Sequence, residues 1–245
     1  MSAVTKVEIF DFPRTKHLPW EANTSRDDLI ASEDEIKQAL SSCDSLQIEE
    51  KVDGANLGVA FDEQDQPIAR NRNHFLRKSF SAKTPAKMQF SSLWTWMYQR
   101  KALFESLAQL LGERVVVYGE WLFACHSIKY NALPDVFLAY DVWIPSERHF
   151  IDSISAREAL QKSGFSVVHG LLCTKTIPNL EQFKSIVISH REGKSAYSAI
   201  DQREGAYIKL CRENALIARY KIVSKSFQPG SRWDSRSIMK NSFAR

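Results

Sequence analysis

The sequence predicts an α+β fold in a single domain. Segments with the composition of strands predominate in the first half and near the C-terminal end, and helical segments are inserted between them without strict alternation. The chain contains no internal repeat, low-complexity tract or obvious interdomain linker. At 245 residues, with 44% hydrophobic and 25% charged residues, it is long enough to bury one substantial core.

Capping and turn residues predict the first elements. Ser32 and Glu35 form a capping-box pattern, which starts a helix that ends near Leu40. Gly54 supplies the tight backbone between two strand-like segments, and a polar turn follows the second of them. The strands expected here cover residues 45–50, 56–61 and 68–70.

The longest predicted helix covers residues 90–111. Leucine, tryptophan, methionine and phenylalanine side chains recur in it at helical spacing, and Gly112 follows as a typical helix end. Residues 115–121 and 136–143 are apolar, β-branched and aromatic, which predicts buried strands. The remaining predictions are helices over 155–163 and 179–189, and strands over 206–210 and 216–223.

Composition argues against several classes of protein. No apolar stretch approaches the roughly 18 residues of a membrane span, and charged residues interrupt the N-terminal segment where a signal peptide would be apolar. The four cysteines show no C-x-x-C spacing, so we expect reduced thiols in the cytoplasm rather than disulfides or a zinc site. The net charge of +4 permits nucleic-acid binding without requiring it.

Four short motifs follow one another along the chain. The first, Lys51-Val52-Asp53-Gly54, is a K-x-D-G element beside a predicted strand. Such an element alone occurs by chance in roughly one chain in twenty of this length, so it is a weak signal. Three further motifs make the ordered set far more specific: residues 118–121 (YGEW), 204–209 (EGAYIK) and 220–223 (YKIV).

This series resembles the motifs of the covalent nucleotidyltransferase superfamily of RNA ligases, DNA ligases and mRNA capping enzymes. Within it, the chain is most similar to the RNA ligase family, of the phage RNA ligase 2 type and its stand-alone bacterial relatives. The likeness covers residues 47–227, and its most specific part is the segment 118–143, with His-Ser-Ile-Lys-Tyr at 126–130. The resemblance implies the nucleotidyltransferase fold, in which antiparallel sheets are flanked by helices and the ATP site lies between the sheets.

The resemblance also implies an ATP-dependent RNA ligase with Lys51 as its nucleophile. Lys51 would attack the α-phosphate of ATP, the AMP would pass to a 5′-phosphate, and a 3′-hydroxyl would displace it. A free lysine has a pKa of about 10.4, and a depression of about 3 units would make roughly a quarter of the molecules neutral at pH 7. We expect partial burial, a metal ion and the neighbouring Lys209 and Lys221 to lower the pKa of Lys51.

Other residues of the site are assigned by the same resemblance. It places Glu49 or Glu50 beside the adenine, Phe137 against the adenine ring, and Glu120 at the ribose or in support of the site. A carboxylate at the inner end of an apolar strand is costly without a partner, which favours a function for Glu120. The remaining nucleotide-binding residues of the first motif are Asp53 and Gly54.

Metal and phosphate contacts complete the predicted site. Glu204 matches the motif glutamate that contacts a metal ion, which would be Mg²⁺ or Mn²⁺, and Mg²⁺ needs only one or two carboxylates. Lys209 and Lys221 would bind the α-phosphate as point charges. Arg70 and Arg72 both fall where the family has a phosphate-binding arginine, with a slight preference for Arg72; the bidentate guanidinium suits that role.

Basic residues around these motifs are predicted to contact nucleic acid. They are Arg77 and Lys78, in a basic stretch that also holds aromatic residues, and Lys225 after the last motif. A solvated surface explains such charges equally well. The tail over 228–245 carries further basic residues, for which contact with the substrate backbone is one interpretation.

The chain departs from the family pattern in two places. Val223 stands where a K-x-K motif has its second lysine, although Lys225 follows shortly. The segment after this motif is too short for an OB domain or a helical C-terminal domain, so the expected organisation is one domain with a core over 45–227. The predicted partner is RNA or a nicked duplex with 5′-phosphate and 3′-OH ends, with a clamp from a partner protein left open. The alternatives are a minimal DNA or RNA/DNA-hybrid nick ligase and an inactive nucleotidyltransferase-like domain that binds nucleic acid.

Overall fold

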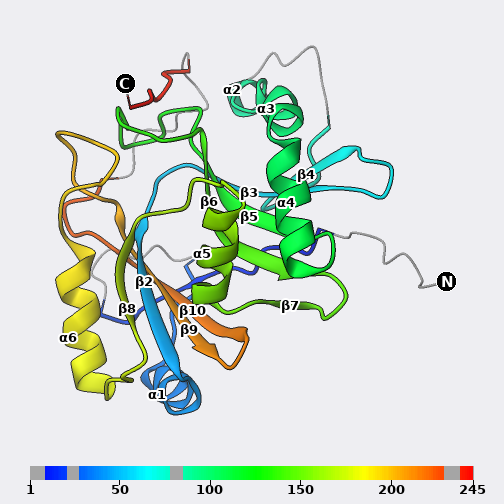
Figure 1. The fold of residues 1–245 in the computed structure, drawn as a ribbon. Helices are drawn as coiled ribbons and strands as arrows, with labels where there is room; N and C mark the ends of the chain where they lie inside the picture. The colour runs from blue at the N-terminus through cyan, green and yellow to red at the C-terminus, as the bar shows by residue number, and fades with distance from the viewer. Residues whose placement is uncertain (1–8, 21–27, 78–84, 229–237, 245) are drawn as a thin grey trace.

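The computed structural model describes residues 9–20, 28–77, 85–228 and 238–244. Two mostly antiparallel five-stranded sheets lie beside each other, and helices cover their outer faces (Figure 1). The α+β class predicted from the sequence is therefore confirmed. No helix in the described parts of the chain is long and apolar enough to cross a membrane.

The first sheet carries three of the four motifs. Its strand order is β1-β10-β9-β2-β8, and only the β1–β10 pair is parallel. The helices α1 (Glu33–Ser42) and α6 (Leu180–Arg191) pack their apolar residues on this sheet, against Leu46, Ile48, Ile208 and their neighbours. The strands are β1 (Lys16–His17), β2 (Ser45–Lys51), β8 (Gly170–Thr174), β9 (Gly205–Arg212) and β10 (Ala215–Val223).

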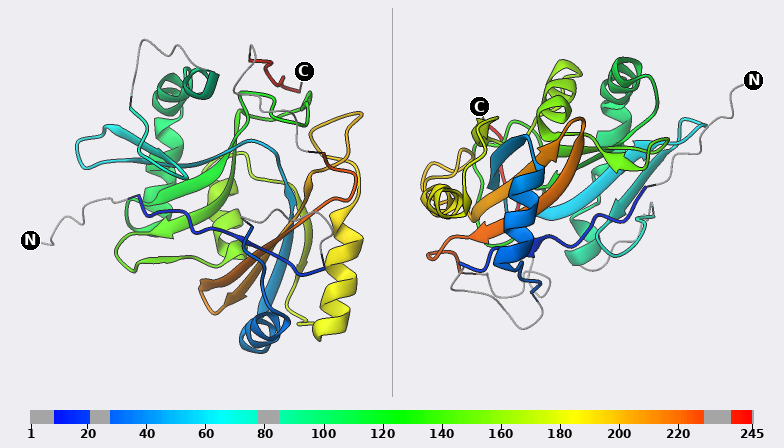
Figure 2. Two further views of the ribbon diagram at one scale, coloured as in Figure 1. Left: turned by 180° about the vertical axis from the view of Figure 1, so that it is seen from behind. Right: turned by 90° about the horizontal axis from the view of Figure 1, so that it is seen from below.

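The second sheet has the order β4-β3-β5-β6-β7 and is antiparallel throughout. Apolar residues of α3 (Leu93–Gln99), α4 (Lys101–Leu111) and α5 (Ser153–Lys162) share one core with this sheet, and the views in Figure 2 show these helices on one side of it. The strands are β3 (Ala55–Phe61), β4 (Pro67–Asn71), β5 (Val116–Trp121), β6 (Phe137–Ile144) and β7 (His149–Phe150).

The helix predicted over residues 90–111 is divided into α3 and α4. Arg100 separates them with φ −106° and ψ 10°, while its guanidinium pairs with Asp135 at 3.2 Å. Apolar residues on both sides of the break face the same core, so the helical spacing continued across a residue that is not helical. Gly112 ends α4 as expected, with a positive φ of 81° that favours glycine.

Side-chain caps confirm the predicted starts of two other helices. The Ser32 hydroxyl accepts a hydrogen bond from the Glu35 amide at 3.1 Å, and Asn179 forms a capping box with Gln182. The short elements β1, β7, β8 and α2 (Pro85–Met88) were not predicted, since a segment of two to five residues carries little periodic signal.

Candidate functional site

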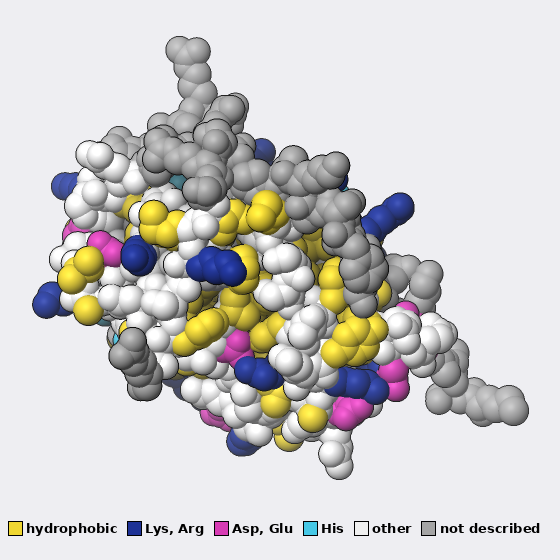
Figure 3. All heavy atoms as spheres, turned by 90° about the horizontal axis from the view of Figure 1, so that it is seen from above, with side chains coloured by type: hydrophobic (Ala, Val, Ile, Leu, Met, Phe, Trp, Pro, Cys, Tyr) yellow, Lys and Arg dark blue, Asp and Glu magenta, His cyan; other side chains and the backbone are white. Residues whose placement is uncertain are grey.

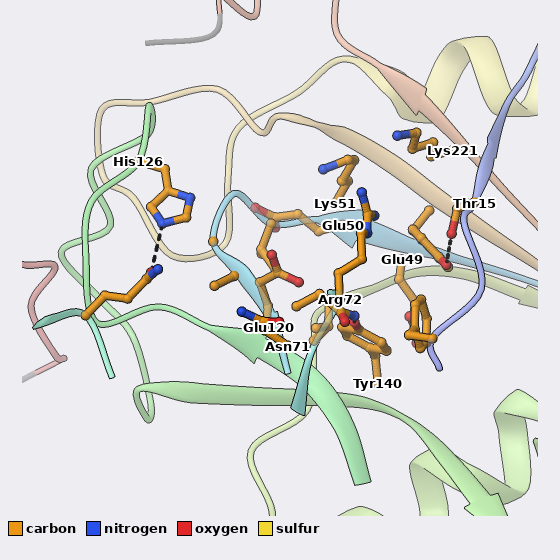
Figure 4. A pocket seen from close by; sticks show the side chains of 18 of the residues that line it. Thr15, Glu49, Glu50, Lys51, Asn71, Arg72, Glu120, His126, Tyr140 and Lys221 are labelled. Atoms are coloured by element: carbon orange, nitrogen blue, oxygen red, sulfur yellow. Dashed lines mark hydrogen bonds between the residues drawn. The ribbon is translucent and has the colours of Figure 1, made fainter. Parts of the chain in front are cut away.

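A cavity of about 410 Å³ lies between the two sheets, at the ends of the strands that carry the motifs (Figure 4). Seen from above, hydrophobic side chains gather near the middle of the molecule's face, with Lys and Arg side chains among and around them (Figure 3). The lining residues discussed below are Phe12, Thr15, Glu49, Glu50, Lys51, Gly54, Asn56, Asn71, Arg72, Gln89, Glu120, His126, Tyr140, Tyr207 and Lys221.

Lys51 lines this cavity, and Glu204, which is not a lining residue, meets it because β2 and β9 pair in register. Lys51 at the end of β2 lies opposite Gly205, so the preceding Glu204 faces the lysine, with Nζ and Oε2 2.6 Å apart. Gly205 also allows β9 to lie close to β10, since a Cβ there would lie 2.1 Å from the carbonyl oxygen of Ile222. Burial raises the pKa of Glu204 to about 7, although the charge of Lys51 acts against this.

The pKa of Lys51 is raised in this structure, contrary to the expectation from the sequence. Burial lowers it, but the carboxylates of Glu204 and Glu120 outweigh burial and stabilise the ammonium form. Lys221 does lie near, and burial followed by the Lys51 charge lowers the pKa of Lys221. Lys209 faces other carboxylates. In this arrangement Lys51 is an ammonium ion that must lose its proton before it can attack.

Glu120 approaches Lys51 from the second sheet. Burial raises the pKa of Glu120 to about 8, with Lys51 acting in the opposite direction. The backbone of Gly54 passes directly beneath it: a Cβ on Gly54 would lie 2.9 Å from Cγ of Glu120 and 2.8 Å from the Trp121 carbonyl oxygen. The glycine of the K-x-D-G motif is therefore what allows Lys51 and Glu120 to share one cavity.

Asp53 supports the site but does not line the cavity. Its Oδ2 accepts hydrogen bonds from the amides of Ser127 and Ile128, at 2.6 and 3.1 Å. Its own amide donates to the Tyr130 hydroxyl at 2.8 Å. The carboxylate predicted to bind nucleotide thus holds the loop that carries His126, which lines the cavity and bonds to Gln89.

Lys209 lies in a buried ion network beneath the cavity. Its side chain is fully buried, and Nζ lies 2.8 Å from a carboxylate oxygen of Glu49 and of Asp141, and 2.6 Å from the Tyr140 carbonyl oxygen. Lys209 is not among the lining residues, so its predicted contact with the α-phosphate does not fit this placement. The network also includes Arg157, which bonds to Glu49 at 2.9 Å, and Arg219, which lies 3.3 Å from Asp141.

Glu49 and Glu50 both line the cavity, and the carboxylates of both already have partners within the protein. Glu49 is 2% exposed and is neutralised by Lys209 and Arg157. Glu50 accepts hydrogen bonds from the Ser195 hydroxyl at 2.5 Å and the Ala196 amide at 2.9 Å. Burial raises the pKa of Glu50. Neither carboxylate is exposed, so the backbone at this end of β2 is the part of the strand that can face a base.

Tyr140, rather than Phe137, presents an aromatic ring to the cavity. Phe137 is 1% exposed and packs against Trp96 in the core, 5.1 Å between ring centroids. Gly119 leaves room for it, since a Cβ there would lie 2.4 Å from the Phe137 ring. A ring in this position cannot stack on a nucleotide, which corrects the prediction. Tyr140 is the extra residue of a β-bulge between β5 and β6, and the bulge turns it toward the cavity.

Two further aromatic side chains join Tyr140. Its ring lies nearly parallel to Tyr207, with centroids 6.2 Å apart, and at an angle to Phe12, 5.7 Å away. The Tyr207 hydroxyl shares a hydrogen bond of 2.7 Å with the Thr15 hydroxyl, and the Tyr140 hydroxyl accepts one from the Asn56 amide. This aromatic wall was not predicted. Phe12 and Thr15 precede every motif, so no motif pointed to them. For Tyr140 and Tyr207, the aromatic character of β6 and β9 was the only signal in the sequence.

The two candidate phosphate-binding arginines differ in position. Arg72 lines the cavity beside Asn71, on the same side of Lys51 as Lys221 (Figure 4). Arg70 does not line it: its guanidinium pairs with Asp11 and lies over the Phe75 ring, 4.9 Å from the centroid. The structure therefore brings Lys51, Lys221 and Arg72 together as the basic side of the cavity.

Neither Arg77 nor Lys225, two of the predicted nucleic-acid residues, lines the cavity. Arg77 and Lys225 are exposed side chains, and Lys78 lies outside the described residues. In the described parts of the chain, no group of three or more histidine, cysteine or acidic side chains is arranged to hold a metal ion. Glu204 and Glu120 nevertheless suit Mg²⁺, which binds through one or two carboxylates together with water and substrate phosphates.

Comparison with known proteins decides the family. The model of the RNA ligase family matches residues 44–223. The chain belongs to the RNA ligase family. This matched region contains all four motifs and both sheets except β1, and the two segments at either end, including Phe12 and Thr15, lie outside it. No curated protein matches the chain.

Solved structures similar to this RNA ligase family member include several of Naegleria gruberi RNA ligase. The structure with pyrophosphate is 17% identical, with a TM-score of 0.58 over 90% of this chain and 62% of that one. A variant with ATP and Mn is 14% identical, with a TM-score of 0.54 over 87% and 59%. A variant with AMP and Mn is also 14% identical, with a TM-score of 0.54 over 86% and 58%. These likenesses show a shared fold, and the chain spans about 60% of those proteins.

Proposed function

We propose that this chain is an ATP-dependent RNA ligase whose nucleotidyltransferase domain forms a covalent lysyl-AMP on Lys51. The observation that carries the proposal is that Lys51, Glu120 and Lys221 line one cavity between the two sheets, and that Glu204 pairs with Lys51 there. A domain that only binds nucleic acid would need none of this combination. Membership of the RNA ligase family and the ATP, AMP and Mn named for the Naegleria gruberi structures support the same activity.

In the first step, Nζ of Lys51 loses its proton and attacks the α-phosphorus of ATP. A P–N bond forms, the bond from the α-phosphorus to the bridging oxygen breaks, and pyrophosphate leaves. Lys221 and Arg72 lie on one side of Lys51, where they bind the phosphates and stabilise the charge that develops on them. Glu204 and Glu120 would hold a divalent cation, which would supply positive charge that competes with the lysine ammonium for these carboxylates and shields the phosphates.

Other residues of the cavity orient the nucleotide. Tyr140 and Tyr207 offer aromatic surface to the adenine, and the backbone at Glu49 and Glu50 faces its edge. Glu120, which lines the cavity, would contact the ribose. The buried network around Lys209 fixes this arrangement, because Lys209 holds both the Glu49 carboxylate and the carbonyl group of the bulged Tyr140.

Two further transfers complete strand joining. An oxygen of the 5′-phosphate attacks the phosphorus of the lysyl-AMP, which releases Lys51 and leaves an adenylated 5′ end. The 3′-hydroxyl then attacks the 5′-phosphate and expels AMP. The predicted nucleic-acid contacts by Arg77, Lys78 and Lys225 stay predictions, and so does Mg²⁺ or Mn²⁺ as the metal.

Sealing of matched nicks tests the substrate. Two nicked duplexes that differ only in the terminal sugar on the 3′-OH side are offered with ATP and Mg²⁺ or Mn²⁺. We expect faster sealing after a terminal ribose, since the 2′-hydroxyl distinguishes RNA from DNA. Equal or faster sealing of the all-DNA nick would make the protein a DNA nick ligase. Preferential labelling by GTP would move it toward the capping enzymes.

A further inference from the structure

The C-terminal segment packs against a loop of the active site. We call residues 238–244 the C-terminal strap and residues 122–133 the pocket loop. Figures 1 and 2 show the red end of the chain beside the green pocket loop. Backbone hydrogen bonds join the two along their length: Cys125 N to Met239 O at 2.8 Å, Ser242 N to Tyr130 O at 3.0 Å, Leu133 N to Ser242 O at 3.2 Å and Ala244 N to Leu133 O at 3.0 Å.

Asn241 makes the side-chain contacts of the strap. Its Oδ1 accepts the Tyr130 amide at 2.9 Å, and its Nδ2 donates to the carbonyl oxygens of Leu122 and Ala124, at 2.9 and 3.2 Å. Backbone groups in a loop lack the regular partners of a helix or sheet, so they need such contacts when water is excluded. One asparagine therefore ties together three backbone groups of the pocket loop that are up to eight residues apart.

The pocket loop in turn holds the nucleophile motif. Tyr130 is fully buried; the strap binds its backbone, while its hydroxyl accepts the amide of Asp53 at 2.8 Å. The Asp53 carboxylate accepts the amides of Ser127 and Ile128. Only Val52 lies between Asp53 and Lys51. A continuous set of hydrogen bonds thus runs from Asn241 through Tyr130 to the K-x-D-G motif.

We propose that the C-terminal strap is a positioning element of the adenylation site and that Asn241 is its central positioning residue. The strap orders the pocket loop, and the ordered loop holds Asp53 and the backbone that carries Lys51. This inference rests on the proposed function, but the strap lies outside the matched family region, which ends at residue 223. It also gives the described part of the basic tail a role that is separate from nucleic-acid binding.

Asn241→Ala tests the proposal, with Ser242→Ala as its matched control. The Ser242 hydroxyl makes no hydrogen bond that involves the described residues, and its backbone contacts survive the substitution. Amide hydrogen exchange without nucleotide should be about tenfold to a thousandfold faster in residues 122–133 of Asn241→Ala. The substitution removes the side-chain hydrogen bonds of Asn241, each contributes about 0.5–1.5 kcal/mol, and every 1.4 kcal/mol is tenfold. Exchange in Ser242→Ala should match the native protein. Equal exchange rates in the two variants would refute the proposal that the strap orders the pocket loop.

Adenylation of the same variants tests the link to Lys51. Asn241→Ala should form the AMP adduct at least about tenfold more slowly than the native protein at saturating ATP. Its final fraction of adduct should equal the native fraction, whereas a partly unfolded sample would give a lower one. Tyr130→Phe, which keeps the strap contacts but loses the hydroxyl bonded to Asp53, should also be slow. Fast hydrogen exchange in Asn241→Ala together with a native adenylation rate would refute the link between the pocket loop and Lys51.

Further variants at Asn241, and a comparison of hydrogen exchange with adduct formation, separate a failure of the strap proposal from a failure of the proposed function. Asn241→Asp keeps the Oδ1 acceptor but sets a carboxylate oxygen against the carbonyl oxygens of Leu122 and Ala124, so its exchange should be at least as fast as that of the alanine variant. Asn241→Ser, whose hydroxyl can donate and accept, replaces the alanine variant should that fail to fold. A native protein that forms no adduct would refute the proposed function, while the exchange comparison would still decide whether the strap orders the loop.

Discussion

Lys209→Met should destabilise the protein because it breaks the buried ion network. Nζ of Lys209 lies 2.8 Å from both Glu49 and Asp141, and the side chain is 0% exposed. Methionine matches the length of lysine but leaves two buried carboxylates with one cation fewer. Removing one partner of a buried ion pair costs about 3–5 kcal/mol. Arg157 and Arg219 remain beside these carboxylates, so we expect the lower end, about 3 kcal/mol.

Thermal unfolding measures this cost. For a chain of this size each kcal/mol corresponds to about 2–4 °C, so Tm should fall by about 6–12 °C. Lys175→Met is the control, because Lys175 is exposed and such surface changes stay within about 0.5 kcal/mol. Circular dichroism at pH 7 and equal protein concentration gives both values.

A phosphate contact by Lys209 predicts the opposite outcome. If Lys209 contacted the α-phosphate, Lys209→Met would abolish adenylation and leave the Tm near that of the control. A Tm within about 2 °C of the native value would therefore refute the burial of this network.

Three further predictions concern the site and the substrate. Glu204→Ala and Lys221→Ala should fold normally and form the AMP adduct roughly 100- to 1,000-fold more slowly, since each removes one preorganised charge; near-native rates would remove that residue from the site. Tyr140→Leu should raise the KM for ATP by roughly 5- to 150-fold, because stacking on a base contributes about 1–3 kcal/mol, and an unchanged KM would place the adenine elsewhere. Arg77→Ala should weaken RNA binding in a titration and reduce its salt slope by about one; an unchanged slope would mean no phosphate contact.

The residues of the motifs were predictable from the sequence, but their relative positions were not. Composition and periodicity located β2, β5 and β6 closely. The register that places Glu204 against Lys51 depends on pairing between strands about 150 residues apart, which periodicity within one strand cannot specify. The raised pKa of Lys51 follows from that pairing, whereas the burial, metal ion and lysines considered from the sequence would all lower it.

Tyr140 faces the cavity in place of the predicted Phe137 for a local reason. Alternation along a regular strand would keep residues 137, 139, 141 and 143 on one face. The bulge at Tyr140 shifts that alternation, so Phe137 and Ala139 face the core together with Val142. A single inserted residue leaves no trace in an apolar sequence whose residues are buried on both faces.

The ends of the chain escaped prediction for another reason. Phe12 and Thr15 reach the cavity from a segment that pairs through only two residues of β1, too few to show any periodicity. The C-terminal strap makes isolated bridges rather than a regular strand. Its basic residues suggested substrate contact, whereas the contacts of residues 238–244 are mainly backbone hydrogen bonds and those of Asn241.

Intact-mass analysis of the protein after exposure to ATP and Mg²⁺ or Mn²⁺ tests the central claim most directly. The native protein should gain the mass of one AMP, because Lys51 is the amine that faces Glu204 and Glu120 in the cavity. Lys51→Ala should gain nothing, and peptide mapping should place the native adduct on Lys51. A native protein that stays unmodified with both metals, or an adduct that persists in Lys51→Ala, would contradict the account.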